Sequence, residues 1–378
     1  MNSYATSGKK SRNLKDKIIY KKSSNGSLNK ERASTLVSDK DYYSNINNMR
    51  SYIIENQPKF FEFFELDEFL NCGSTGHVFK GKYKLNKIPV ALKFIINRLK
   101  AKRKEKRKSK NASQEAIIWK KLHNSKITEM YSYLKINDDC KFLVLEYAKH
   151  GDLSYFMNFL LKRRVLSETA LNYFGKQILE GLEYIHRCKI AHMDIKPGNI
   201  LIDSNLNAIL TDFSVSYNYS SLNSKDKVKL PFVGTSKFIS PEILSEELIE
   251  IREAEKIDIY SLGVCLYYLF FGEYPYNLKD VKNKDYQGIL LKIKEEELIF
   301  NKNREISGLF KDFLIKILEK DYKKRINIEQ ALHHPWIQGA TIIFDEKENI
   351  ENQERFLIEL ITDNIPKFNG YIHKEIYN

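Results

Sequence analysis

The sequence predicts an α+β fold in which a small strand-rich first part is joined to a larger, mainly α-helical second part. Two observations predict it. Between Phe63 and Ala148, short apolar runs are separated by glycine and other turn residues, which is typical of β-strands. After Gly151, apolar residues recur at helical spacing over long stretches. The change near Gly151 therefore indicates the boundary between the two parts.

The strand-rich part begins with two strands on either side of a glycine turn. The stretch LDEFLNCGSTGHVFKGKYK, residues 66–84, holds two short apolar runs that flank this turn. Two further apolar runs, IPVALKFII (88–96) and CKFLVLEYA (140–148), predict two more strands, the last of them buried. Between these runs, residues 112–123 show the apolar spacing of a helix.

The helix-rich part is clearest in the stretch LSETALNYFGKQILEGLEYIHRC, residues 166–188. Its large apolar residues recur at helical spacing and fall on one face, so a long helix with a buried side is expected. These residues are Leu171, Phe174, Ile178, Leu182 and Ile185.

The two ends of the chain differ from its middle. Residues 1–56 are rich in Ser, Asn and Lys without a sustained apolar period, and we expect a disordered, basic N-terminal extension there. Residues 338–378 form a C-terminal tail, in which ERFLIELI (354–361) has the pattern of one amphipathic helix. That pattern is compatible both with docking on the rest of the chain and with disorder.

The net charge of +13 is concentrated in two segments. Residues 1–50 carry +7 and the run RLKAKRKEKRKSK, residues 98–110, carries +8, which leaves about −2 for everything else. A charge run of this kind is typical of a solvated segment. The functional alternatives are a nuclear-import signal read by an import receptor, an acidic partner, or nucleic acid. No aromatic residue interleaves the run, which argues against nucleic-acid bases stacking on it.

Cysteine usage and hydropathy favour an intracellular protein. The four cysteines lie far apart and show no metal-ligand spacing: Cys72, Cys140, Cys188 and Cys265. The N-terminus lacks the apolar core of a signal peptide. The longest apolar run, 262–271, is too short to span a bilayer. We therefore expect a cytoplasmic protein without membrane association, and the basic run leaves a nuclear location open.

Four short motifs follow one another in a fixed order. A glycine turn at residues 73–76 precedes Lys93, which lies inside the third predicted strand. The loop HMDIKPGNI, residues 192–200, gathers an acid, a cation and an amide, and the stretch 211–213 (TDF) follows twelve residues after the amide. Each motif alone has a simpler explanation, such as a hairpin turn, an edge lysine or a capping loop. In this order and spacing, they resemble the eukaryotic protein kinase family over residues 64–337.

The resemblance implies a bilobal, protein-kinase-like fold, with a small antiparallel β-rich N-lobe (64–147) and a larger mainly α-helical C-lobe (151–337). It implies an ATP-dependent transferase that moves the γ-phosphoryl group of ATP to Ser or Thr hydroxyls of protein substrates, with ATP and Mg²⁺ as cofactors. Lys196 within the loop is similar to the serine/threonine type, and the C-lobe resembles calmodulin-dependent kinases.

The resemblance also assigns residues to roles. Asp194 would accept the proton of the substrate hydroxyl, Lys196 would steady the γ-phosphoryl group, and Asn199 completes the catalytic loop. Asn199 and Asp212 supply hard oxygen ligands suited to Mg²⁺. The residues expected to bind the nucleotide are Asn71, Gly73, Gly76, Val78, Ala91, Lys93, Glu115, Glu146, Ala148, Asp152 and Leu201.

Within that set, Glu115 is the expected carboxylate partner of Lys93. It opens the helical run at 112–123, whereas Glu105 lies within the basic run and Glu129 lies beyond the helix.

Further matches extend the resemblance to the C-lobe. Thr235 and Glu242 fit the segment that ends the activation loop, Asp258 fits an aspartate that braces the catalytic loop, and Arg325 fits the arginine that pairs with Glu242.

Three residues depart from the family pattern. Asn71 stands at the first glycine position, Ser214 replaces the glycine of the DFG motif, and Met193 replaces the arginine of HRD. Methionine cannot form the charge-assisted pair with a loop phosphate that arginine forms. We therefore expect Met193 to pack as an apolar prop.

Two other functions share parts of this pattern. A pseudokinase scaffold of the same fold is expected to lack at least one of four catalytic groups, and all four are present here: Lys93, Asp194, Asn199 and Asp212. A small-molecule kinase of the aminoglycoside or choline type has a similar catalytic loop but lacks the Glu242 segment with its arginine partner.

Overall fold

The computed structural model describes much of the chain between residues 47 and 339. The described residues are 47, 49–51, 53–55, 57–72, 76–96, 114–135, 140–157, 165–282, 284–301 and 304–339. Gly73, the basic run 98–110, most of the N-terminal extension and residues 340–378 lie outside them, so the expectations for those residues stay predictions.

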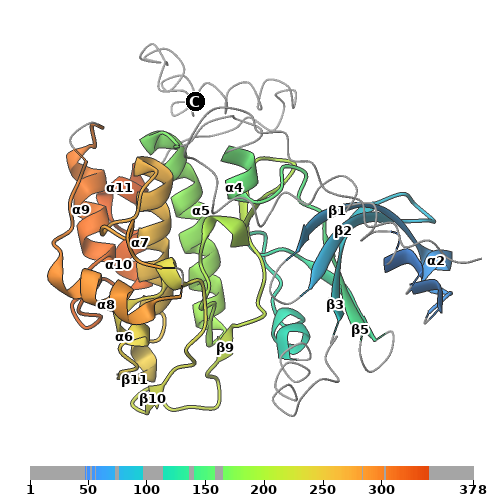
Figure 1. Ribbon diagram of the computed structural model, residues 1–378, viewed down its shortest axis with the longest axis horizontal. Coiled ribbons are helices and arrows are strands. Elements are labelled where there is room, and N and C mark those ends of the chain that lie inside the picture. The colour runs from blue at the N-terminus through green and yellow to red at the C-terminus, as the bar shows by residue number, and fades with distance from the viewer. Residues whose placement is uncertain are drawn as a thin grey trace, which may run out of the picture. The chain divides into compact units, whose positions relative to one another are not determined.

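Five antiparallel strands form one sheet in the order β1-β2-β3-β5-β4 (Figure 1). They are β1 (Phe64–Cys72), β2 (His77–Tyr83), β3 (Pro89–Ile96), β4 (Met130–Lys135) and β5 (Cys140–Glu146). The strands expected around the glycine turn and in the two later apolar runs are therefore confirmed. In the register of the sheet, Lys93 of β3 lies between Val78 of β2 and Leu143 of β5.

One face of the sheet buries a cluster of aromatic rings. Phe60, in the short helix α2 (Phe60–Phe63), packs with ring centroids 5.1 Å from both Phe64 and Phe142. Met49 and Ile53, from the residues before α2, are buried in the same cluster. Such aromatic pairs stabilise beyond the area that they bury.

The structure corrects the expected end of the disordered extension. The described residues between 47 and 55 are helical, although disorder was expected through residue 56. Two apolar side chains, Met49 and Ile53, hold this short segment against the sheet. The expected helix at 112–123 is shorter than its pattern, since only 114–119 are helical among its described residues.

The C-lobe is mainly helical and also contains short strands. Its helices are α4 (Leu153–Tyr155), α5 (Glu168–Arg187), α6 (Pro241–Leu244), α7 (Lys256–Phe271), α8 (Tyr286–Glu295), α9 (Gly308–Ile317), α10 (Ile328–Leu332) and α11 (Pro335–Gln338). Among its described residues, 3₁₀ turns are formed by η2 (Pro197–Asn199), η3 (Ser236–Phe238) and η4 (Ile251–Glu253). Its described strands pair as β6 (Ile190–Ala191) with β9 (Tyr217–Asn218), β7 (Ile200–Ile202) with β8 (Ala208–Leu210), and β10 (Lys227–Lys229) with β11 (Leu248–Glu250).

The long predicted helix is α5, and its start is fixed by a cap. The Ser167 hydroxyl accepts a hydrogen bond from Ala170 N–H, which satisfies one of the free donors at the helix start. All five apolar residues of its predicted face are buried. They pack in the main hydrophobic core with α7 and α9 (Figure 1).

The structure confirms the α+β fold class, with an antiparallel sheet in the N-lobe and a helical C-lobe. None of the described helices is both long and apolar enough to cross a membrane.

Candidate active site

The loop after β6 holds Asp194 in a network of four hydrogen bonds. Its Oδ1 accepts hydrogen bonds from the backbone N–H and the hydroxyl of Thr235, at 2.8 and 2.7 Å. Its Oδ2 accepts hydrogen bonds from Lys196 Nζ at 2.7 Å and Asn199 Nδ2 at 2.9 Å. The side chain remains 11% exposed. The carboxylate is therefore fixed in orientation but reachable from solvent.

A glycine lets Thr235 approach this loop. Gly234 has a φ of 104°, in the left-handed region, and a Cβ built there would lie 2.6 Å from the Met193 carbonyl oxygen. Only glycine tolerates both that backbone conformation and that approach.

Asp258 of α7 supports the catalytic loop from within the core. Its oxygens accept hydrogen bonds from the backbone N–H groups of His192 and Met193 and from His186 Nε2, each at 2.8 Å. Burial by itself would raise the pKa of Asp258, but the hydrogen bonds and charge interactions from His186 and His192 together outweigh burial, and the pKa lies below its ordinary value. The left-handed backbone at Met193, with a φ of 70°, is thereby held by a buried carboxylate.

Lys93, Glu115 and Asp212 form a buried ionic cluster. Lys93 Nζ lies 2.6 Å from Glu115 Oε1 and 2.9 Å from Asp212 Oδ1. Burial opposes the charge of Lys93, but the two carboxylates outweigh it and raise the pKa of the amine. Burial raises the pKa of Glu115, against the opposing effect of Lys93. Burial likewise acts to raise the pKa of Asp212, but Lys93 outweighs it and lowers that pKa.

The residues after Asp212 anchor this cluster to both lobes. The Asp212 backbone is left-handed, with a φ of 64°, and its Oδ1 accepts a hydrogen bond from Ser214 N–H at 3.3 Å. Phe213 is buried, with its ring centroid 5.1 Å from those of Trp119 and His192. Trp119 belongs to the helix that carries Glu115, so one packing contact positions both carboxylates.

The glycine turn is described at its two ends. Asn71 is exposed and lies opposite Val78 in the register of β1 and β2. A Cβ on Gly76 would lie 2.2 Å from the Phe94 carbonyl oxygen, so the turn returns close against β3.

The residues expected around adenine come from both lobes. Val78 is half-buried and Ala91 is buried on the sheet, where Ala91 lies opposite Leu145 of β5. Leu201 of β7 is half-buried and forms a bridge with Asp152, which caps α4 by accepting a hydrogen bond from Tyr155 N–H. Burial raises the pKa of Asp152.

Glu146 and Ala148, the two expected nucleotide contacts in the segment that joins the lobes, differ in their backbone hydrogen bonds. The backbone N–H of Glu146 donates to the Glu129 carbonyl at 2.9 Å. Ala148 accepts a hydrogen bond from Gly151 at its carbonyl, while its N–H donates to no described residue. The Ala148 N–H is therefore the donor that this segment can offer to a ligand.

Asn199 and Asp212 fit a magnesium ion by the chemistry of their donors. Asn199 donates both of its side-chain hydrogen bonds through Nδ2, so its Oδ1 accepts none from described residues. Asp212 accepts its hydrogen bonds through Oδ1, so its Oδ2 likewise accepts none from described residues. Mg²⁺ takes one or two carboxylate or amide oxygens and completes its shell with phosphate and water. Among the described residues, no cluster of three or more His, Cys, Asp or Glu could hold a metal by itself.

The end of the activation segment is tied into the C-lobe. Arg325 donates to both oxygens of Glu242, at 2.7 and 3.0 Å, and both side chains are almost fully buried. This is the pairing that the sequence resemblance implied.

Met193 lies in an apolar cluster next to the activation segment. It is buried with Tyr219, Leu230 and Ile239. Met193 therefore makes apolar packing contacts, as expected from the sequence.

His186 was not anticipated as part of the site. It lies at the end of α5, directly after the buried Ile185, and its ring bonds Asp258. A polar residue beside the apolar face of a helix was the available signal, but that pattern alone does not identify a partner 72 residues away.

A family model described as the protein kinase domain matches residues 64–337 of the chain. The chain is 33% identical over 318 residues to death-associated protein kinase 2 of Homo sapiens, covering 80% of this chain and 81% of that protein. It is 31% identical over 253 residues to serine/threonine-protein kinase GIN4 of Saccharomyces cerevisiae, covering 66% and 21%. It is 30% identical over 275 residues to serine/threonine protein kinase OSK3 of Oryza sativa subsp. indica, covering 73% and 50%.

Proposed function

The chain belongs to the eukaryotic serine/threonine protein kinase family, and from this premise we propose that it is an active enzyme. It transfers the γ-phosphoryl group of ATP to serine or threonine hydroxyls of protein substrates.

The proposal is carried by one observation: the groups needed for phosphoryl transfer are held in two networks of hydrogen bonds. Lys93 and Asp212 are bonded at 2.9 Å, and Asp194 and Asn199 are bonded at 2.9 Å. Phosphoryl transfer requires positioning and charge neutralisation more than covalent chemistry, so a fixed constellation of this kind is what it needs.

Asp194 is the base in this mechanism. It accepts the proton of the substrate hydroxyl as that oxygen attacks the γ-phosphorus in line. The bond between the γ-phosphorus and the bridging oxygen breaks, and ADP leaves with the electron pair. Lys196, which lies against the same carboxylate, neutralises charge on the transferring group.

The remaining groups hold the nucleotide. Lys93, oriented by Glu115, binds the α- and β-phosphates, and the Ala148 N–H hydrogen-bonds the adenine ring. A bound Mg²⁺ supplies charge neutralisation on the phosphates. Asn199 Oδ1 and Asp212 Oδ2 would hold it.

The paired Glu242 and Arg325 favour a protein kinase over a small-molecule kinase, because they brace the end of the segment on which a peptide would lie. The free thiols of Cys188 and Cys265 fit the intracellular location expected from the sequence.

The test is transfer from ATP, with Mg²⁺, to a library of serine- and threonine-containing peptides by the purified full chain. We expect transfer by the wild type and by Asp280→Asn, which changes an exposed aspartate in the same way. Asp194→Asn and Lys93→Met should lose it. Equal, background-level incorporation in all four proteins would support the scaffold function instead.

A further inference from the structure

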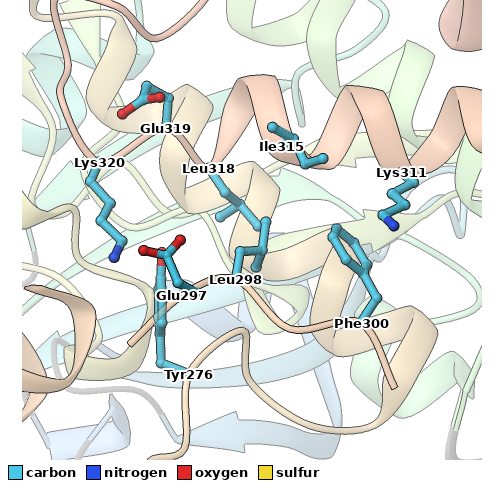
Figure 2. A pocket seen from close by; sticks show the side chains of 9 residues that line it. All are labelled: Tyr276, Glu297, Leu298, Phe300, Lys311, Ile315, Leu318, Glu319 and Lys320. Carbon is cyan, nitrogen blue, oxygen red and sulfur yellow. The ribbon is translucent and has the colours of Figure 1, made fainter. Parts of the chain in front are cut away.

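A groove of about 430 Å³ lies on the C-lobe at a site that the proposed mechanism does not use. Its floor combines Leu298 and Phe300, from the segment after α8, with Ile315 and Leu318 at the end of α9 (Figure 2). Figure 2 shows Leu298 and Leu318 together in the middle, with Lys311 and Lys320 at opposite ends. The groove thus has an apolar floor with a lysine at each end.

Part of the apolar floor of the groove is exposed, although Leu318 itself is buried. On α9, Phe310, Phe313, Leu314 and Ile317 face the core, whereas Ile315 is 47% exposed. The segment opposite is held in place, since Tyr267 donates to the Ile299 carbonyl at 2.5 Å and Lys320 donates to the Glu296 carbonyl at 2.6 Å. This fixed segment presents half-buried Leu298 and Phe300 beside the exposed Ile315, which gives a small apolar surface on which an amphipathic helix can pack.

The charges at the two ends of the groove differ. Lys311 lies 5.2 Å from the Phe300 ring and forms no ion pair with a described residue. At the other end Lys320 is accompanied by Glu297 and Glu319 (Figure 2). The Lys311 end is therefore the one that attracts an acidic group.

We propose that residues 351–363 of this same chain dock in the groove as an amphipathic helix. The stretch ENQERFLIELITD contains four acids and one arginine, for a net charge of −3. Its apolar residues Phe356, Leu357, Leu360 and Ile361 share one face at helical spacing. An amphipathic helix laid in an apolar groove is a recurring mode of recognition, and the acids complement Lys311.

The tail is long enough to reach the groove within one chain. The described chain ends at Gly339, directly after α11, and α11 packs against α9, which lines the groove. Eleven residues, 340–350, precede the docking stretch. Extended, they span up to about 36 Å, whereas α9 with its ten residues is about 15 Å long.

The experiment is hydrogen exchange, followed by mass spectrometry, on the full chain. In the wild type, amides of residues 353–362 should exchange at least about tenfold more slowly than unprotected amides. Ile315→Asp, in the groove, and Leu360→Asp, in the tail, should each remove this protection. The matched control is Leu309→Asp, which alters a 51% exposed leucine of the same helix outside the groove and should retain protection.

Four results would overturn the proposal. Tail amides that are unprotected in the wild type show that the tail does not dock. Protection that survives Ile315→Asp places the tail elsewhere, and protection that survives Leu360→Asp rules out the proposed apolar face. Protection that appears only at high protein concentration, together with a doubled mass in light scattering, would mean that the tail of a second copy occupies the groove. Ile315→Asp could itself destabilise the fold, which a lower unfolding temperature than that of Leu309→Asp would show. In that case the exchange protection of the tail in Leu360→Asp is the deciding measurement, because this substitution leaves the groove intact.

Discussion

Asp194, the proposed base, is held in a fixed orientation by its neighbours. Three residues donate four hydrogen bonds to it, and one of them, Thr235, comes from a segment 41 residues further along the chain. Its hydroxyl donates to Asp194 and accepts from Lys196, at 2.7 Å in each case. The Thr235 hydroxyl therefore links the Asp194 carboxylate to the Lys196 amine.

Removing that hydroxyl should slow transfer without weakening nucleotide binding. Thr235→Val keeps the shape of the side chain but leaves Asp194 and Lys196 each short of one partner, so we expect the turnover rate to fall about tenfold or more. Thr235→Ser should restore most of the rate. Turnover and ATP affinity should be measured together, because a matching loss in affinity would mean that Thr235 supports the nucleotide site instead.

Asp212 should make the stability of the protein depend on acid pH. Burial acts to raise its pKa, but Lys93 outweighs this, and the folded pKa lies below the ordinary 3.8. Such a carboxylate stabilises the folded state above the ordinary pKa and loses this contribution as pH falls through the folded value. In urea unfolding from about pH 7 to pH 3, the wild type should lose stability relative to Asp212→Asn only below about pH 5. A constant difference would contradict the ion pair.

At the scale of elements, the activation segment, residues 213–239, is held in place by strand pairing and apolar packing. It pairs with the rest of the C-lobe through β9 on β6 and β10 on β11, and its apolar residues Leu230 and Val233 pack in the cluster that includes Met193. A segment ordered by strand pairing and apolar packing has less need of an arginine and a phosphate.

We therefore expect activity without phosphorylation of this segment. The fully dephosphorylated protein should keep its initial rate on a fixed peptide. A loss of more than about tenfold, or 1.4 kcal/mol, would reveal a phosphate receptor. Alanine at Lys108 and Lys110, just before the helix of Glu115, would then show whether the basic run provides it.

The ion pair of Arg325 and Glu242 should matter for stability far more than a surface pair. Breaking a buried pair leaves a charge without a partner, so Arg325→Met should lower the free energy of unfolding by about 3–5 kcal/mol. The control is Arg252→Met, since Arg252 is 58% exposed and lies 2.8 Å from Glu250; its loss should cost about 0–1 kcal/mol. If denaturant unfolding shows that both substitutions lower the free energy of unfolding equally, burial of the ion pair does not determine its contribution to stability.

Elements with strong local patterns could be predicted from the sequence, and others could not. Strands β1 and β2 were evident from apolar runs around glycines, and α5 from the spacing of its buried face. Strand β4 has only its first residue buried and no glycine turn beside it, so no pattern indicated it. The helical residues near Met49 lie in a polar stretch and depend on two apolar contacts with a distant sheet.

At the scale of the whole molecule, the candidate site exists only where the two lobes meet. Lys93 of the sheet bonds Asp212, which lies 119 residues further along the chain in the C-lobe. Motif order suggested that these residues belong together, but the hydrogen bonds that orient them depend on tertiary contacts such as His186 with Asp258. The candidate site is thus built by residues of both lobes.

The most direct test of this account measures phosphoryl transfer and ATP binding on the same proteins. In rapid-quench experiments with ATP, Mg²⁺ and a peptide selected from the library, Asp194→Asn should transfer about 10²–10⁴-fold more slowly than the wild type. Its affinity for ATP should be close to that of the wild type, because Asp194 acts on the accepting hydroxyl. A wild type that binds ATP but transfers no faster than Asp194→Asn would contradict the account and identify the protein as a scaffold.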